Sequence, residues 1–206
     1  MTTYETGAAE TGAAETGAAE TGAAETGAAE TGAAETGAAE TGAALRSRTH
    51  TWQQRPEMTP EILGMSGLEI LQASMKGELP GASMMSTLGF RLTDASEGVA
   101  VFEGEPGDHL LNPMGTVHGG FLATLLDSAL GSAVMTRLPA GTSYTTVQLG
   151  VHMIRPVMAD TPTLRCEGTA LHVGRSTATA EARVVGTHDG KLYAHGTTTC
   201  VVLRMG

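Results

Sequence analysis

The stretch that decides the fold runs from residue 112 to residue 137 and reads Asn-Pro-Met-Gly-Thr-Val-His-Gly-Gly-Phe-Leu-Ala-Thr-Leu-Leu-Asp-Ser-Ala-Leu-Gly-Ser-Ala-Val-Met-Thr-Arg. Within it, residues 118–137 give the strongest helical pattern in the chain. On a helical projection, one compact stripe holds the apolar side chains Leu122, Leu125, Leu126, Ala129, Ala133 and Met135. We expect this stripe to pack on a sheet.

The opposite face of the same helix gathers small residues around one carboxylate: Gly120, Ala123, Thr124, Asp127 and Gly131. Asp127 is the only charged residue between residues 119 and 136. A solvated helix would carry Lys, Glu or Arg on this face, so we expect it to meet a second helix or a ligand. Asp127 would then be partly desolvated and would need partners, although a solvent-facing Asp127 is the alternative.

His118-Gly119-Gly120 stands at the predicted start of this helix. Glycines there let a ligand approach free backbone N–H groups, which can bind an anion or a developing oxyanion. His118 could be a general base or a structural residue whose ring fixes the loop. We favour the structural role, because the sequence places no acid or hydroxyl beside it.

The flanking sequence predicts one further helix and several short strands. A helix begins at Thr59, a suitable N-cap, and runs through Ile62 to Met75. Six strands are expected: two around a turn within residues 86–104, then 144–156, 163–172, 176–186 and 191–203. One helix flanked by antiparallel hairpins predicts an α+β fold in which a sheet curls around residues 118–137.

Period-two alternation is clearest in the strand at residues 144–156. Val147, Leu149, Val151 and Met153 are expected on one face, with Thr146, Gln148, Gly150 and His152 on the other. This pattern predicts a half-buried strand.

The N-terminal sequence differs in kind from the rest. The pentapeptide Glu-Thr-Gly-Ala-Ala occurs eight times without substitution over residues 5–44. As a helix it would form no apolar stripe, and Ala and Thr bury too little area to offset the cost of ordering the backbone. We therefore expect residues 1–57 to be a disordered tail and linker, and residues 58–206 to form one domain.

Composition narrows the classes of function. The repeat contains 8 of the 22 acidic residues and none of the 12 basic ones, which leaves residues 45–206 near neutrality. That balance argues against nucleic acid as a partner. No apolar run is long enough to span a membrane, so a membrane partner is not expected either. Cys166 and Cys200 lie far apart, which favours reduced thiols and a cytoplasmic location over a disulfide framework.

Several chemistries lack their motifs in this sequence. There is no GxSxG elbow, GxGxxG fingerprint, Walker loop or HExxH pair. The seven histidines show no metal-binding pair at helical spacing. We expect neither a metal ion nor a cofactor.

With these residues placed, the sequence resembles the hotdog-fold acyl-CoA thioesterases of the phenylacetate-degradation type. The resemblance runs from about Ser66 to Leu203. It is carried mainly by residues 112–120 and by Thr-Leu-Leu-Asp at 124–127, with Tyr-Thr-Thr at 144–146, Arg-Pro at 155–156 and Gly-Arg-Ser at 174–176.

The resemblance implies hydrolysis of an acyl-CoA thioester by dimers joined edge to edge, and usually by dimers of dimers. The Gly119 N–H would polarise the thioester carbonyl with help from the Asn112 amide, and His118 would hold that loop. Asp127 would activate water or attack directly. Thr146 falls where the family often has a hydroxyl near the attacking water.

Geometry adds an argument for a composite site. Gly120 and Asp127 share a helix face but lie roughly 10.5 Å apart along the axis. A two-fold axis would bring Asp127 of one chain near Gly119 of its partner, and the small-residue face would be the dimer contact.

The phosphates of CoA need local cations. Arg175, beside Ser176 in a predicted strand turn, is the first candidate, and Arg155 is the second, although each could be an ordinary solvated arginine. Two alternatives to a thioesterase remain. One is a non-catalytic acyl-CoA-binding hotdog module, which would not need Asp127, and the other is a hotdog dehydratase.

Overall fold

The protein is described from a computed structural model that covers residues 44–54 and 56–205. The chain divides into two units, residues 1–46 and 47–206. Only residues 44–46 of the first unit are described, so most of the predicted repeat tail lies outside the described residues. All the elements below belong to the second unit.

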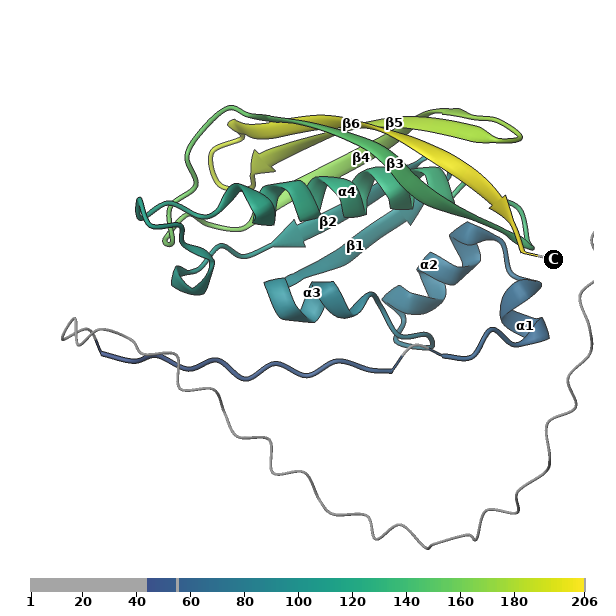
Figure 1. The fold of residues 1–206 in the computed structure, drawn as a ribbon, viewed down its shortest axis with the longest axis horizontal. Coiled ribbons are helices and arrows are strands. Elements are labelled where there is room, and N and C mark those ends of the chain that lie inside the picture. Colours follow the sequence, from purple (N-terminus) through teal and green to yellow (C-terminus); the bar gives the residue numbers. More distant parts are fainter. Residues whose placement is uncertain (1–43, 55, 206) are drawn as a thin grey trace, which may run out of the picture. The chain divides into compact units, whose positions relative to one another are not determined.

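Six antiparallel strands form one sheet in the order β1-β2-β4-β5-β6-β3. The strands are β1 (Phe90–Ser96), β2 (Val99–Gly104), β3 (Thr142–Met153), β4 (Leu164–Val173), β5 (Thr177–Gly186) and β6 (Leu192–Arg204). Figure 1 shows this sheet curving around the long helix α4 (Gly119–Met135). The expected α+β fold with a central helix is confirmed.

Helix α4 supplies one side of the hydrophobic core. Of its predicted stripe, Leu125, Leu126, Ala129 and Ala133 have no exposed surface, and Leu122 is 3% exposed. The strand β4 crosses α4 so closely that a Cβ atom added at Gly168 would lie 2.3 Å from the carbonyl oxygen of Ala129. These five residues therefore pack in the core as predicted, whereas Met135 is only half-buried and lies against Gly67. Glycine at position 168 permits the close approach of backbone to backbone.

The predicted helix from Thr59 to Met75 is wrong in one respect, because two helices occupy that stretch. Helix α1 (Pro60–Leu63) is capped by Thr59, and helix α2 (Gly67–Met75) begins after a new cap at Ser66. The Ser66 hydroxyl accepts from the Glu69 N–H, while the Glu69 carboxylate accepts from the Ser66 N–H, which is a capping box. That box starts a second helix rather than continuing the first.

The predicted strand pair over residues 86–104 begins late. Residues 83–88 form the short helix α3 (Ser83–Leu88), which ends at Gly89 with φ 76°. Only after this left-handed residue does β1 start. A one-turn 3-10 helix, η1 (Asp108–Leu110), then leads from β2 towards the loop before α4.

The strand β3 departs from simple alternation. A bulge interrupts its pairing with β6 between Thr146 and Gln148. The extra residue turns Val147 outward, where its side chain is 58% exposed, while Leu149 and Val151 still pack against the core. The expected burial of Val147 is therefore wrong, because a bulge shifts the side-chain period by one residue.

Among the residues described here, no helix is long and apolar enough to cross a membrane. Cys166 and Cys200 are free thiols buried in the sheet. Burial raises the pKa of both thiols above its ordinary value.

Candidate active site

Asp127 lies on α4 at the wall of an apolar chamber of about 300 Å³. Its Oδ1 accepts a 3.0 Å hydrogen bond from the hydroxyl of Thr146 on β3. The other side chains around the chamber are uncharged, and they include Leu71, Met85, Leu92, Phe102 and Tyr144. The structure thus places one partly buried carboxylate, held by a hydroxyl, against apolar surface.

Tyr144 packs beside Asp127 on the small-residue face of α4. Its ring lies directly over Gly131, where an added Cβ would approach the phenol oxygen to 2.4 Å. Burial, with smaller contributions from Cys200 and Asp127, raises the pKa of Tyr144 above its ordinary value, so the phenol is neutral. The small-residue face of α4 was expected to meet a second helix or a ligand. At this end of α4 it meets β3 of the same chain instead, through Tyr144.

The loop before α4 is a tight turn organised by Asn112. The side-chain oxygen of Asn112 accepts from the Met114 N–H at 2.9 Å and from the Thr116 N–H at 3.3 Å, while its amide nitrogen donates to the Thr116 hydroxyl at 2.9 Å. Gly115 closes the turn with φ 81°. Asn112 therefore fixes this loop as an Asx turn, in addition to the carbonyl-binding role that the resemblance implies.

His118 is the N-cap of α4. Its Nδ1 accepts from the Gly120 N–H at 2.9 Å, which requires that the ring proton be on Nε2. The sequence-based preference for a loop-fixing His118 agrees with this cap. The Gly120 N–H is occupied by the ring, whereas the Gly119 N–H meets no acceptor within the described part of the chain. Gly119 is thus the donor at this helix start that is open to a ligand.

A second cleft, of about 360 Å³, lies at this helix start. It brings Asn112 and Gly119 together with Arg155, which follows the end of β3. The side chain of Met153 also borders it, and its Cε would lie 3.0 Å from a Cβ added at Gly119. Glycine at position 119 therefore keeps this cleft open beside the free N–H.

Arg175 and Ser176 lie elsewhere, in the exposed turn between β4 and β5. The Ser176 carbonyl accepts from the Val202 N–H, and Val202 pairs with Tyr144 near the start of β3. Arg155 follows the other end of that strand. Within one chain, the two candidate arginines therefore lie at opposite ends of the sheet. Arg175 lies at the end that is further from Gly119.

Sequence reasoning missed two contributors to the Asp127 chamber. Tyr144 was noted only as part of a motif, although its spacing of two residues from Thr146 places both side chains on one face of the strand. The stretch around Pro80 and Ala82 also lines the chamber, because α2 and α3 fold across it. No sequence signal placed those residues beside Asp127, since that contact joins segments far apart in the chain.

Comparison with known proteins identifies the family. The Thioesterase superfamily matches residues 114–193, which include Gly119, Asp127 and Thr146. The chain belongs to that superfamily. A candidate esterase of Halobacterium salinarum is 34% identical over 111 residues, which are 52% of this chain and 72% of that protein.

Two solved structures give the same result. A candidate thioesterase of Ralstonia eutropha, related to phenylacetic acid degradation, is 29% identical, with a TM-score of 0.58 over 64% of this chain and 98% of its own. A single-site mutant of the phenylacetic acid degradation protein PaaI of Thermus thermophilus is 32% identical, with a TM-score of 0.53 over 58% of this chain and 98% of its own. The resemblance to PaaI-like hotdog thioesterases is confirmed, and the protein is a thioester hydrolase.

Proposed function

We propose that this thioesterase hydrolyses an acyl-CoA to a free carboxylic acid and CoA, with Asp127 and Gly119 as its central catalytic residues. The observation that carries the proposal is the Thr146–Asp127 hydrogen bond at the wall of an apolar chamber. A carboxylate in such surroundings is suited to act on a bound thioester, and the apolar chamber is suited to an acyl group.

The proposed reaction uses the Gly119 N–H and the Asp127 carboxylate. The Gly119 N–H donates to the thioester carbonyl oxygen and stabilises the negative charge that develops there. Asp127 removes a proton from water as the water oxygen attacks the carbonyl carbon. The carbon–sulfur bond then breaks, and the CoA thiolate takes up the proton that Asp127 received from the water, which restores the carboxylate. Direct attack by Asp127, followed by hydrolysis of the anhydride, uses the same two residues and remains the alternative.

We further propose that each site is shared between two chains. Gly119 and Asp127 are eight residues apart, which is about 12 Å along a helix axis, and in one chain they border different clefts. The Gly119 N–H must lie about 3 Å from the thioester carbonyl oxygen, and Asp127 about 3 Å from the attacking water. Within one chain the two residues are too far apart to meet both conditions for the same thioester. A two-fold axis would pair each Asp127 with a partner's Gly119.

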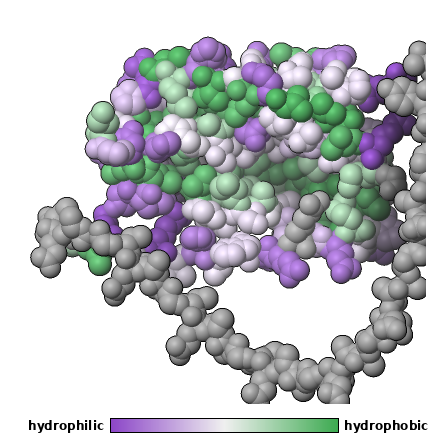
Figure 2. Space-filling model, in the orientation of Figure 1, coloured by the Kyte–Doolittle hydropathy of each residue, from purple (hydrophilic) through white to green (hydrophobic). Residues whose placement is uncertain are grey.

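The edge of the sheet supports such a dimer. The strand β3 pairs only with β6 among the described strands and carries no Lys, Arg, Asp or Glu over its 12 residues. Exposed edge strands are usually protected by charges or proline, so a long uncharged edge favours pairing with a second copy. Val147 and Met153 on this strand are 58% and 48% exposed, and Figure 2 shows hydrophobic residues in the band where Figure 1 draws β3. Assembly of such dimers into a dimer of dimers stays a prediction.

Of the two arginines, Arg155 has the stronger structural case as a phosphate ligand. It borders the cleft that contains Gly119, so a CoA whose thioester reaches Gly119 passes close to it. Arg175 and Ser176 would contact CoA only from the other end of the sheet. We keep them as phosphate ligands for the composite site, where a partner chain could supply them.

The test is Asp127→Asn, which keeps the size of the side chain and its ability to accept from Thr146. We expect thioesterase turnover to fall by about two orders of magnitude or more, as for loss of a general base, with unchanged melting temperature and oligomeric state. Release of free thiol from a panel of acyl-CoA substrates measures the effect. Near-wild-type turnover would remove Asp127 from the mechanism, and acyl-CoA binding without turnover in the wild type would favour the binding module.

A further inference from the structure

The Asp127 chamber adjoins a second chamber. The second one has a volume of about 390 Å³ and shares five wall residues with the first: Ile70, Pro80, Gly81, Ala82 and Met135. Met135 lies two turns beyond Asp127 on α4, on the side away from Gly119. We call the chamber at Asp127 the inner chamber and the one beyond Met135 the outer chamber.

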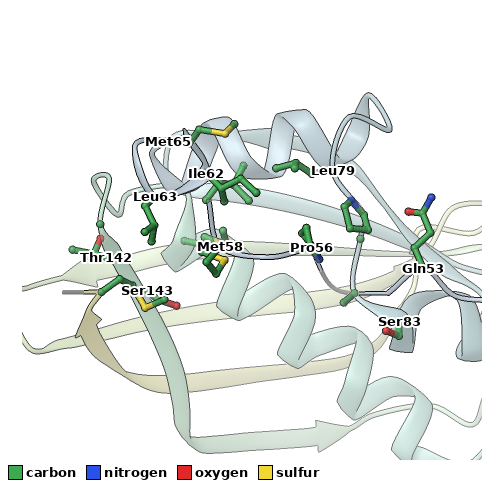
Figure 3. A pocket seen from close by; sticks show the side chains of 17 residues that line it. Gln53, Pro56, Met58, Ile62, Leu63, Met65, Leu79, Ser83, Thr142 and Ser143 are labelled. Carbon is green, nitrogen blue, oxygen red and sulfur yellow. The ribbon is translucent and has the colours of Figure 1, made fainter. Parts of the chain in front are cut away.

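The outer chamber is formed in part by the segment before α2. Figure 3 shows Met58, Ile62 and Leu63 approaching from that segment and Ser143 from the start of β3, with Leu79 lining the same space. None of its described wall residues carries a charge, and the polar ones are Gln53, Ser83, Thr142 and Ser143. Aliphatic and thioether side chains therefore make most of its surface.

We propose that the outer chamber binds the distal part of a straight aliphatic acyl chain whose thioester lies near Asp127. This inference rests on the proposed acyl-CoA hydrolysis and adds its substrate class: acyl-CoA esters of medium length, about eight to twelve carbons. The wall residues that the two chambers share, Met135 among them, give the acyl chain a path from one chamber to the other. The uncharged lining favours methylene groups over a carboxylated or hydroxylated end.

The enzyme should then distinguish acyl chains of different length by the number of methylene groups that it buries. Each methylene moved from water into apolar surroundings strengthens binding by up to about fourfold. A butanoyl group ends within the inner chamber, whereas the distal end of a decanoyl group reaches the wall that the two chambers share at Met135. Methionine suits this partition, because its unbranched side chain can move aside for a ligand.

The test fills the outer chamber without touching Asp127, Thr146 or Gly119. Ser143→Phe projects a ring from β3 into the chamber, and Leu79→Trp fills it from the opposite wall, so that one variant remains if the other fails to fold. Ser96→Phe is the matched control, because Ser96 is exposed at the end of β1 and borders neither chamber. Melting temperatures identify any variant that is merely destabilised.

Two measurements are made on the full chain. The first is kcat/KM for butanoyl-CoA and decanoyl-CoA. We expect wild type to prefer decanoyl-CoA, and each filling variant to lose about tenfold or more on decanoyl-CoA while changing less than about twofold on butanoyl-CoA. The second is calorimetric binding of S-butyl-CoA and S-decyl-CoA, thioethers that cannot be hydrolysed, for which the same length dependence is expected.

The outcomes separate the two proposals. Length-dependent binding that the filling variants abolish, without any hydrolysis, would support the outer chamber and overturn the proposed function. Hydrolysis that depends on Asp127 but shows no gain from butanoyl to decanoyl would overturn the outer chamber alone. Equal losses on both chain lengths in folded variants would also overturn it, as would a partner chain occupying the outer chamber.

Discussion

The hydroxyl of Thr146 donates a 3.0 Å hydrogen bond to Oδ1 of Asp127, and this bond joins the edge strand β3 to the central helix α4. It depends on local irregularity, because the bulge that follows Thr146 lets this residue face the helix while Val147 turns outward. With one carboxylate oxygen held by the hydroxyl, the carboxylate orientation is fixed relative to the inner chamber. Thr146 is therefore a positioning residue for Asp127.

Thr146→Val tests that positioning. The valine has the same shape but lacks the donor, and a hydrogen bond to a charged group is commonly worth about 1.5–3 kcal/mol. We expect kcat to fall about tenfold or more while KM changes less than about twofold, because the bond acts on the catalytic group rather than on substrate. Thr146→Ser should restore most of kcat, and Thr145→Val, at the exposed neighbouring position, should have little effect. An equal loss in the serine variant would show that shape, not the hydroxyl, matters.

Gly168→Ala tests the contact between sheet and helix. The added Cβ would meet the Ala129 carbonyl oxygen at 2.3 Å, and both partners are backbone atoms that cannot rotate away. Overpacking of this kind costs about 1–3 kcal/mol or more, which for a domain of this size lowers the melting temperature by about 2–12 °C or more.

Gly64→Ala is the control for that change. Gly64 ends α1 with φ −77° and ψ −10°, a conformation open to any residue, and its added Cβ would contact only carbonyls of its own turn. Its effect on the free energy of unfolding should stay within about 1 kcal/mol. Similar melting temperatures for both variants would contradict the close crossing of β4 over α4.

The sequence was sufficient for the central helix and for most of the strands. Helix α4 has a regular apolar stripe in its sequence and a clear start at His118, and it begins within one residue of the predicted position. The β hairpins were predictable for a similar reason, since turns such as the one at Gly190 require a left-handed glycine. Local patterns and turn chemistry decide these elements.

The errors have both local and non-local causes. The break between α1 and α2 had a local signal, because Ser66 and Glu69 have the spacing of a capping box. The docking of α2 is non-local, because Gly67 lies against the Met135 carbonyl, where an added Cβ would be only 2.0 Å away. The bulge in β3 likewise depends on its pairing with β6. In the candidate site, Asp127 was found because a lone charge on an apolar helix is a local anomaly. Its chamber was not found, because α2, α3 and β3 assemble it.

The two buried thiols predict loss of stability in alkali. An exposed thiol has a pKa near 8.5 in the unfolded chain, and burial raises the pKa of Cys166 and Cys200 in the folded chain. Above pH about 8.5 the unfolded state therefore binds fewer protons than the folded state, so stability falls as pH rises, by up to about 1.4 kcal/mol per pH unit for each thiol.

Urea unfolding between pH 7 and 10, with reductant present, measures this effect. The double variant Cys166→Ala with Cys200→Ala should be less stable at pH 7 but should show a flatter decline above pH 8.5. Keeping below pH 10 avoids the ionisation of Tyr144 in the unfolded chain, which would add to the decline. Parallel curves for wild type and the double variant would contradict the buried state of the thiols.

Complementation between two inactive variants tests the shared site. Asp127→Asn removes the carboxylate, and Gly119→Pro removes the N–H that would bind the carbonyl oxygen. Proline is well suited to the first position of a helix, and the residue before it, His118, already has φ −60° and ψ 134°, which a following proline accepts. The Cβ of the proline would meet only the flexible end of the Met153 side chain, so we expect α4 to remain intact.

In a mixed dimer of these variants, one site contains both defects and the other contains neither. Each variant alone should be nearly inactive, whereas unfolding and refolding an equal mixture should restore about a quarter of the wild-type activity per chain, because half of the dimers are mixed and each has one intact site. A mixture of Asp127→Asn with Asp127→Ala is the control and should restore none. If the Asp127→Asn and Gly119→Pro mixture also stayed inactive while size-exclusion chromatography showed mixed dimers, each site would have to lie within one chain.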